Sequence, residues 1–125
     1  MANVINWFEI PAKNFEQASK FYSTVLGGEV RRMDNPHGLW GFLPGTAQGM
    51  TETVGGAIVQ SDGYVPAANG SVVYLNGGDD LNVPLSRVEK AGGKVLLPKT
   101  PLGPNGFMAL FLDTEGNKIG FHSMK

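Results

Sequence analysis

One short pattern occurs twice in this chain, and it constrains the fold more than any other feature. Leu26-Gly27-Gly28-Glu29-Val30 and Ala91-Gly92-Gly93-Lys94-Val95 each follow an amphipathic helical stripe and each open an apolar run of strand type. Glycine is typical of the residue that ends a helix, and β-branched residues favour strands. The repetition predicts two copies of one structural unit, at about residues 1–60 and 70–125, within a single domain spanning residues 1–125.

Each copy has the element order of a βαβββ unit. The first is predicted to contain a helix capped by Asn14 with Gln17 as its capping-box partner, and strands at residues 4–10, 29–33, 38–43 and 55–59. The second is predicted to contain a helix that begins at residues 80–82 and runs to Ala91, and strands at residues 71–76, 94–97, 107–112 and 118–122. A unit of about sixty residues buries too little apolar surface to be stable alone. We therefore expect an α+β fold in which two βαβββ repeats form a cup-shaped mixed sheet with helices outside.

The composition excludes several classes of partner. The chain has a formal net charge of -1 and 17% charged residues, so it offers no basic field for nucleic acid or for an anionic membrane surface. No apolar run reaches the ~20 residues of a membrane span. The chain has no cysteine, which excludes disulfides and thiolate sites and fits a reducing compartment. We expect a cytoplasmic protein.

Three stretches carry a resemblance to a known family. They are Trp7-Phe8-Glu9-Ile10-Pro11 followed by Phe21-Tyr22, Val73-Tyr74-Leu75 followed by Asp79-Asp80, and Asp113-Thr-Glu-Gly116-Asn117. With them the chain resembles the vicinal oxygen chelate superfamily, which includes glyoxalases, bleomycin-resistance proteins and extradiol dioxygenases. The resemblance spans nearly the whole chain and implies the glyoxalase/bleomycin resistance fold.

The resemblance also implies where a metal would be bound. Three of the positions that carry metal ligands in metal-dependent members of the superfamily fall on Trp7, near Val73 and on Gly120. None of these side chains can bind a divalent ion, which needs about three nitrogen or oxygen donors. We therefore expect neither a metal nor another cofactor.

The remaining candidates for a ligand-binding cleft are Trp7, Glu9, Trp40 and His122. Alternation along a strand places Glu9 on the face of Trp7, and His122 on the face of Gly120. Glu9 and His122 either satisfy each other's hydrogen bonds as a structural pair or act as an acid/base pair or polar anchor for a ligand. Trp40 either stacks on a planar ligand or belongs to the core. The turn-rich link at residues 99–106 is a candidate flap over the cleft, and no catalytic residue is assigned.

Three functions remain open at this point. The first is a metal-free protein that binds a small molecule and forms a homodimer, because pairing across a two-fold axis protects the edge strands of a sheet. The second is a metal-dependent lyase, isomerase or dioxygenase whose ligands have moved to Glu9, His122 and a third residue such as Gln60 or Glu52. The third is an interaction module without a ligand.

Overall fold

The computed structural model describes residues 4–46 and 53–125. The first unit consists of β1 (Trp7–Pro11), α1 (Phe15–Leu26), β2 (Arg31–Asn35), β3 (Gly38–Phe42) and β4 (Gly55–Ser61). The second consists of β5 (Val73–Asn76), α2 (Asn82–Leu85), β6 (Lys94–Pro101), the 3-10 turn η1 (Gly103–Asn105), β7 (Phe107–Leu112) and β8 (Lys118–Ser123). None of the described helices has the length and apolarity needed to cross a membrane.

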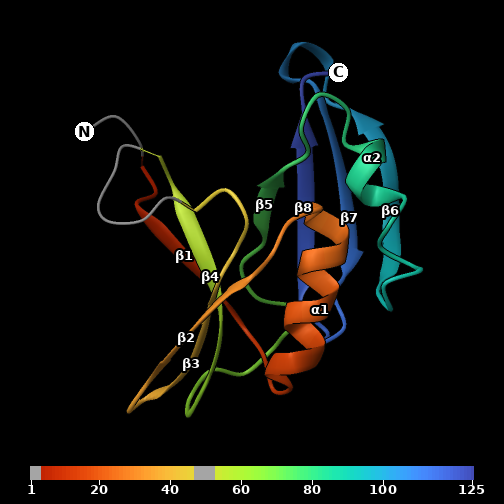
Figure 1. Ribbon diagram of the computed structural model, residues 1–125. Coiled ribbons are helices and arrows are strands. Elements are labelled where there is room, and N and C mark those ends of the chain that lie inside the picture. Colours follow the sequence, from red (N-terminus) through yellow and green to blue (C-terminus); the bar gives the residue numbers. More distant parts are fainter. Residues whose placement is uncertain (1–3, 47–52) are drawn as a thin grey trace.

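The two units build sheets of the same topology (Figure 1). The strand orders are β1-β4-β3-β2 and β5-β8-β7-β6, which we call sheet A and sheet B. In each sheet the first strand of the unit pairs in parallel with the last, and the other neighbours are antiparallel. This arrangement confirms the predicted fold class of two βαβββ repeats.

Helix α1 begins and ends where the sequence predicts. The Asn14 side chain accepts a hydrogen bond from the Gln17 backbone N–H at 3.1 Å, and the Asn14 amide donates to the Gln17 side chain. Gly27 ends the helix with φ 71°, a left-handed conformation that glycine adopts without steric cost. The apolar stripe of α1 is buried and comprises Phe15, Ala18, Phe21, Tyr22 and Val25.

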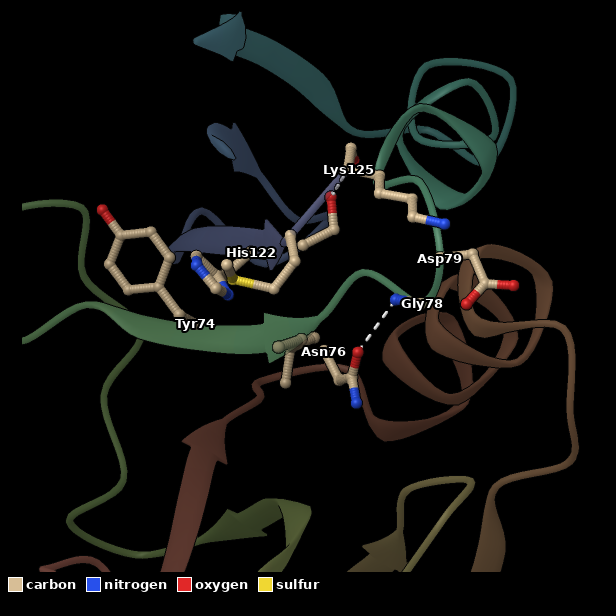
Figure 2. Close-up of a pocket in the computed structure, with 9 residues that line it drawn as sticks. Tyr74, Asn76, Gly78, Asp79, His122 and Lys125 are labelled. Carbon is tan, nitrogen blue, oxygen red and sulfur yellow. Dashed lines mark hydrogen bonds between the residues drawn. The ribbon is translucent and has the colours of Figure 1, made fainter. Parts of the chain in front are cut away.

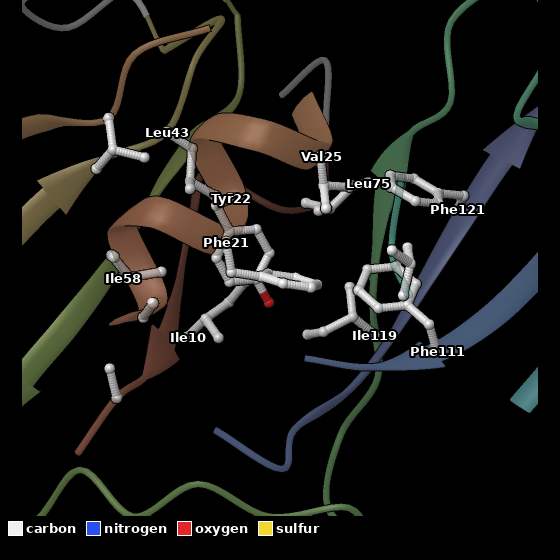
Figure 3. Packing of buried hydrophobic residues seen from close by; sticks show 14 of the residues in the cluster. Ile10, Phe21, Tyr22, Val25, Leu43, Ile58, Leu75, Phe111, Ile119 and Phe121 are labelled. Carbon is white, nitrogen blue, oxygen red and sulfur yellow. The ribbon is translucent and has the colours of Figure 1, made fainter. Parts of the chain in front are cut away.

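That stripe of α1 packs against both sheets. A methyl group added to Gly41 of β3 would meet Phe15 and Ile58, which places the start of α1 on sheet A. Further along α1, the ring centroids of Phe21 and Phe111 are 6.0 Å apart, which places Phe21 on sheet B. A single buried cluster includes residues of α1 and of both sheets (Figure 3). The units therefore share one core, as their small size requires.

A buried polar network joins α1 to the turn between β7 and β8. The Tyr22 hydroxyl donates to Asp113 Oδ2 at 2.7 Å, and the Asn117 amide donates to the same oxygen at 2.9 Å and to the Pro11 carbonyl at 2.8 Å. Burial, together with the adjacent Asp113 carboxylate, raises the pKa of Tyr22 well above its usual range. The Asp-x-x-Gly-Asn turn thus holds together α1, β1 and sheet B.

Several predicted boundaries were shifted by one or two residues, and three differ in a way that has a clear physical reason. The strand expected from residue 4 begins at Trp7, because its partner strand begins at Gly55, opposite Trp7, and Val4 is exposed. The helix expected to reach Ala91 is α-helical only over Asn82–Leu85, because the backbone N–H of Val88 bonds three residues back, to Leu85.

The third wrong boundary is that of the expected flap at residues 99–106, whose first three residues belong to β6. β6 continues to Pro101 and pairs with β7 as far as Pro101↔Phe107. Only a tight connection remains between the two strands, and the Leu102 N–H closes it by donating to the Gly106 carbonyl at 2.7 Å.

Candidate functional site

Glu9 is the centre of a cluster of aromatic hydrogen-bond donors. The indole N–H groups of Trp7 and Trp40 donate to Glu9 Oε2 at 3.3 Å and 3.1 Å. The Tyr64 hydroxyl donates to Glu9 Oε1 at 2.7 Å. We call Trp7, Glu9, Trp40 and Tyr64 the Glu9 site. It brings together three of the four residues predicted to line a ligand cleft, while their role in binding stays a prediction.

Strand register places these side chains on one face of sheet A. Glu9 lies opposite Ala57 on β4, and Trp40 of β3 lies opposite Val59. Because alternate residues of a strand point to opposite faces, Glu9 and Trp40 point away from the shared core that buries Ile10. Ala57 and Val59 are nonetheless fully buried. A second layer of side chains therefore covers this outer face.

Tyr64 is the member of the site that comes from a loop, and its place at the rim of a cleft could be suspected from the sequence but its partner could not. It follows β4 in a loop, where its backbone N–H donates to the Ser61 carbonyl at 3.2 Å in a tight turn. The turn returns the chain over the outer face of sheet A, and the rings of Tyr64 and Trp40 pack edge to face with centroids 6.3 Å apart. Loop composition predicts a turn here but not the direction of the Tyr64 side chain.

The environment keeps the Glu9 carboxyl group ionised at neutral pH. Partial burial raises its pKa, but the hydrogen bonds from Tyr64, Trp40 and Trp7 outweigh burial, and the net pKa lies below the usual glutamate value. The same interaction raises the pKa of Tyr64, because its hydroxyl donates to Glu9. Glu9 is therefore a half-buried anion held by neutral donors.

Glu9 also lines a pocket of about 240 Å³ at the seam between the two sheets. Pro11 of β1, Val73 of β5 and Lys118 of β8 contribute to its walls, and Val65 comes from the loop that carries Tyr64. No ion pair joins Glu9 to a cation in the described part of the chain. The carboxylate is thus the acidic group of an open pocket.

His122 lies on sheet B and has different neighbours. Its Nε2 is 2.7 Å from the Asn105 carbonyl oxygen of η1. With Tyr74, Asn76 and Met124 it lines a second, larger and more open pocket of about 660 Å³ (Figure 2). The proposed pair of Glu9 and His122 does not form within the chain, because the two residues stand on different sheets and have other hydrogen-bond partners.

The positions that the resemblance assigns to metal ligands are occupied by other groups. Trp7 is hydrogen bonded to Glu9, as described, and Val73 packs against the core instead of standing on the outer face. Its neighbour Tyr74 pairs with Gly120, and a methyl group on Gly120 would overlap the Tyr74 ring. The Tyr74 ring therefore fills the space beside Gly120 in which the family resemblance places the side chain of Val73.

The alternative ligand set finds no geometric support within the described residues. Among residues 4–46 and 53–125, no group of three or more His, Asp or Glu side chains could hold a metal ion. The Gln60 side-chain oxygen accepts a hydrogen bond from the Phe15 N–H at 2.6 Å, at the start of α1. Glu52 lies outside the described residues. The absence of a metal in the working protein stays a prediction.

Comparison with known proteins extends the fold to a family. The model of the Glyoxalase/Bleomycin resistance protein/Dioxygenase superfamily matches residues 4–121. A glyoxylase-like domain-containing protein from Didymella fabae is 35% identical over 119 residues, which cover 90% of this chain and 88% of that protein.

Two solved structures illustrate the similarity of the fold. An antibiotic binding protein from Streptomyces sp. CB03234 superimposes with a TM-score of 0.62 at 23% identity, covering 98% of both chains. Glyoxalase I from Zea mays gives a TM-score of 0.68 at 22% identity over 94% of this chain, which spans 45% of the maize chain. From the matched family model and the Didymella relative, the chain belongs to the Glyoxalase/Bleomycin resistance protein/Dioxygenase superfamily.

Proposed function

We propose that this protein binds a small organic molecule at the Glu9 site and does so without a metal. The observation that carries the proposal is the Glu9 carboxylate, which neutral aromatic donors orient at the edge of a pocket. A pocket with largely apolar walls, here Val65, Val73 and Ile119 among others, and a few fixed polar groups is typical of small-molecule sites. The antibiotic binding by one structural neighbour is in keeping with this proposal.

Thermal denaturation in the presence of a library of small organic compounds tests the proposal. A ligand at one hundred times its dissociation constant stabilises the folded protein by about 2.7 kcal/mol, which corresponds to a rise of about 10 °C in Tm for a chain of this size. Trp40→Phe should weaken the response, because it removes one donor to Glu9, whereas Tyr74→Phe on sheet B should not. The proposed function is contradicted if no compound of the library raises the Tm.

Metal analysis separates this function from the metal-dependent alternative. Elemental analysis of protein purified without chelators should find no stoichiometric divalent metal. A fully occupied ion, or a rise of several degrees in Tm on addition of Ni²⁺, Fe²⁺ or Mn²⁺, points instead to a metal-dependent lyase, isomerase or dioxygenase.

We also propose a homodimer in the cytoplasm. Large apolar side chains lie exposed on the outer faces of the sheets and at the C-terminus, with Trp7 40%, Tyr74 48% and Met124 63% accessible. Association would bury them, and it would also protect the edge strands. Sedimentation at micromolar concentration should give twice the chain mass of 13.3 kDa, and a monomer mass contradicts the dimer. For the location, the support is the cysteine-free composition.

A further inference from the structure

The Glu9 carboxylate retains one open position for a hydrogen bond. An ionised carboxylate has about four acceptor sites, two on each oxygen. Oε2 accepts from both Trp7 and Trp40, whereas Oε1 accepts from Tyr64 alone. The second acceptor site of Oε1 has no partner among the described residues, and Glu9 lines the seam pocket. A ligand in that pocket can therefore reach an oriented anionic oxygen.

The groups around this oxygen suit a positive charge. All three donors to Glu9 are neutral, so they fix the carboxylate without cancelling its charge. Lys118 lines the same pocket but makes no ion pair with Glu9. The apolar walls of the pocket, which include Val65, Val73 and Ile119, suit the hydrocarbon part of an organic molecule. Among the described residues, Glu9 is the one acidic side chain that lines the pocket and no ion pair neutralises it, so an incoming cation meets an oriented anion even though Lys118 lines another part of the wall.

We propose that the ligand of the Glu9 site is an organic cation, namely a protonated amine whose N–H donates to Glu9 Oε1 while its apolar part packs against Val65 and Val73 in the seam pocket. This inference rests on the proposed small-molecule binding and names the chemical class that the site selects. A neutral or anionic molecule of the same size lacks the charge-assisted hydrogen bond and binds more weakly.

The chain carries its own reporter for this proposal. It contains two tryptophans, and both indole N–H groups donate to Glu9. A ¹H–¹⁵N correlation spectrum of the full chain therefore has two indole signals, and both report on this carboxylate. The experiment titrates benzylammonium, benzyl alcohol and benzoate at pH 7, three probes that share a ring and differ in charge.

Benzylammonium should move both indole signals and bind about tenfold more tightly than benzyl alcohol, and benzoate should bind least. Glu9→Gln should bring the cation and the alcohol to about equal affinity, within twofold. Glu29→Gln removes the same charge from an exposed residue outside the site and should leave the preference unchanged. If Glu9→Gln does not fold, the wild-type chain serves instead: its preference for benzylammonium over benzyl alcohol should disappear as the pH is lowered through the Glu9 pKa, because the protonated carboxyl group carries no charge.

Three results overturn the inference. They are binding of benzyl alcohol or benzoate as tight as that of benzylammonium, a preference that survives in Glu9→Gln, and no response to any of the three probes. A neutral or anionic binder from the compound library leaves the proposed function standing and removes only the selection for cations. A library without binders removes both.

Discussion

Replacing Tyr22 by Phe tests whether the polar network between α1 and the β7–β8 turn stabilises the shared core. The change deletes one hydroxyl, which is fully buried and donates to Asp113 at 2.7 Å. A hydrogen bond to a charged group contributes about 1.5–3 kcal/mol. Asp113 keeps its bonds from the Asn117 amide and from the backbone N–H groups of Glu115 and Asn117, so it is not left without partners. We therefore expect a loss near the lower end, about 2 kcal/mol.

Urea and thermal unfolding measure this loss. With an unfolding entropy of about 2.1 cal/mol/K per residue, 2 kcal/mol lowers the Tm of this chain by about 8 °C. Tyr74→Phe is the matched control, because Tyr74 is 48% exposed and its hydroxyl has no hydrogen bond to any of the described residues. The control should change stability by less than about 0.5 kcal/mol. Equal losses in the two variants contradict the assigned role of Tyr22.

The pH dependence supplies a second test of the same bond. The folded-state pKa of Tyr22 is raised, so an unfolded chain ionises this tyrosine near pH 10 while the folded chain keeps it neutral. The stabilisation is therefore complete below about pH 10 and is lost as the pH rises toward the folded-state pKa. The stability difference between the wild type and Tyr22→Phe should narrow above pH 10. A constant difference up to pH 11 refutes the reasoning.

Three further outcomes are expected. Gly120→Ala should lower the free energy of unfolding by about 1–3 kcal/mol, because the added methyl group overlaps the Tyr74 ring. In a protein that already carries Tyr74→Ala, urea unfolding should show that most of this loss is absent. The two indole signals should shift together in a pH titration, with a midpoint below the usual glutamate pKa of about 4.3, and the shift should disappear in Glu9→Gln. Since the folded-state pKa of Glu9 is lowered, the ionised carboxylate stabilises the folded protein at pH values above about 4.3. This contribution is lost as the pH falls through the folded-state pKa of Glu9. His122→Ala should lower the free energy of unfolding by about 0.5–1.5 kcal/mol, because the hydrogen bond to the Asn105 carbonyl is lost. It should leave both indole signals unshifted, because His122 belongs to the other sheet, and a shift of these signals contradicts that separation.

The fold was predictable because its signals are local and occur twice. Helix caps, glycine pairs and apolar runs each depend on a few adjacent residues, and the repeat of the pattern identified the βαβββ unit. Alternation also placed Trp7 and Glu9 correctly on one face. It could not show that this face and the face of His122 belong to different sheets, since strand order depends on pairings between distant residues. The contact of Tyr64 with Glu9 was hidden for the same reason, because it spans 55 positions.

The packing of α1 on both sheets also has a consequence for how the chain is synthesised. Tyr22 and its partner Asp113 are 91 positions apart. At about 5–20 residues per second, a ribosome needs roughly 5–20 s to add the second after the first. During that interval α1 presents Phe21 and Tyr22 without the sheet that covers them. The nascent first unit is therefore the stage at which chaperones would recognise this protein and at which aggregation competes most strongly with folding.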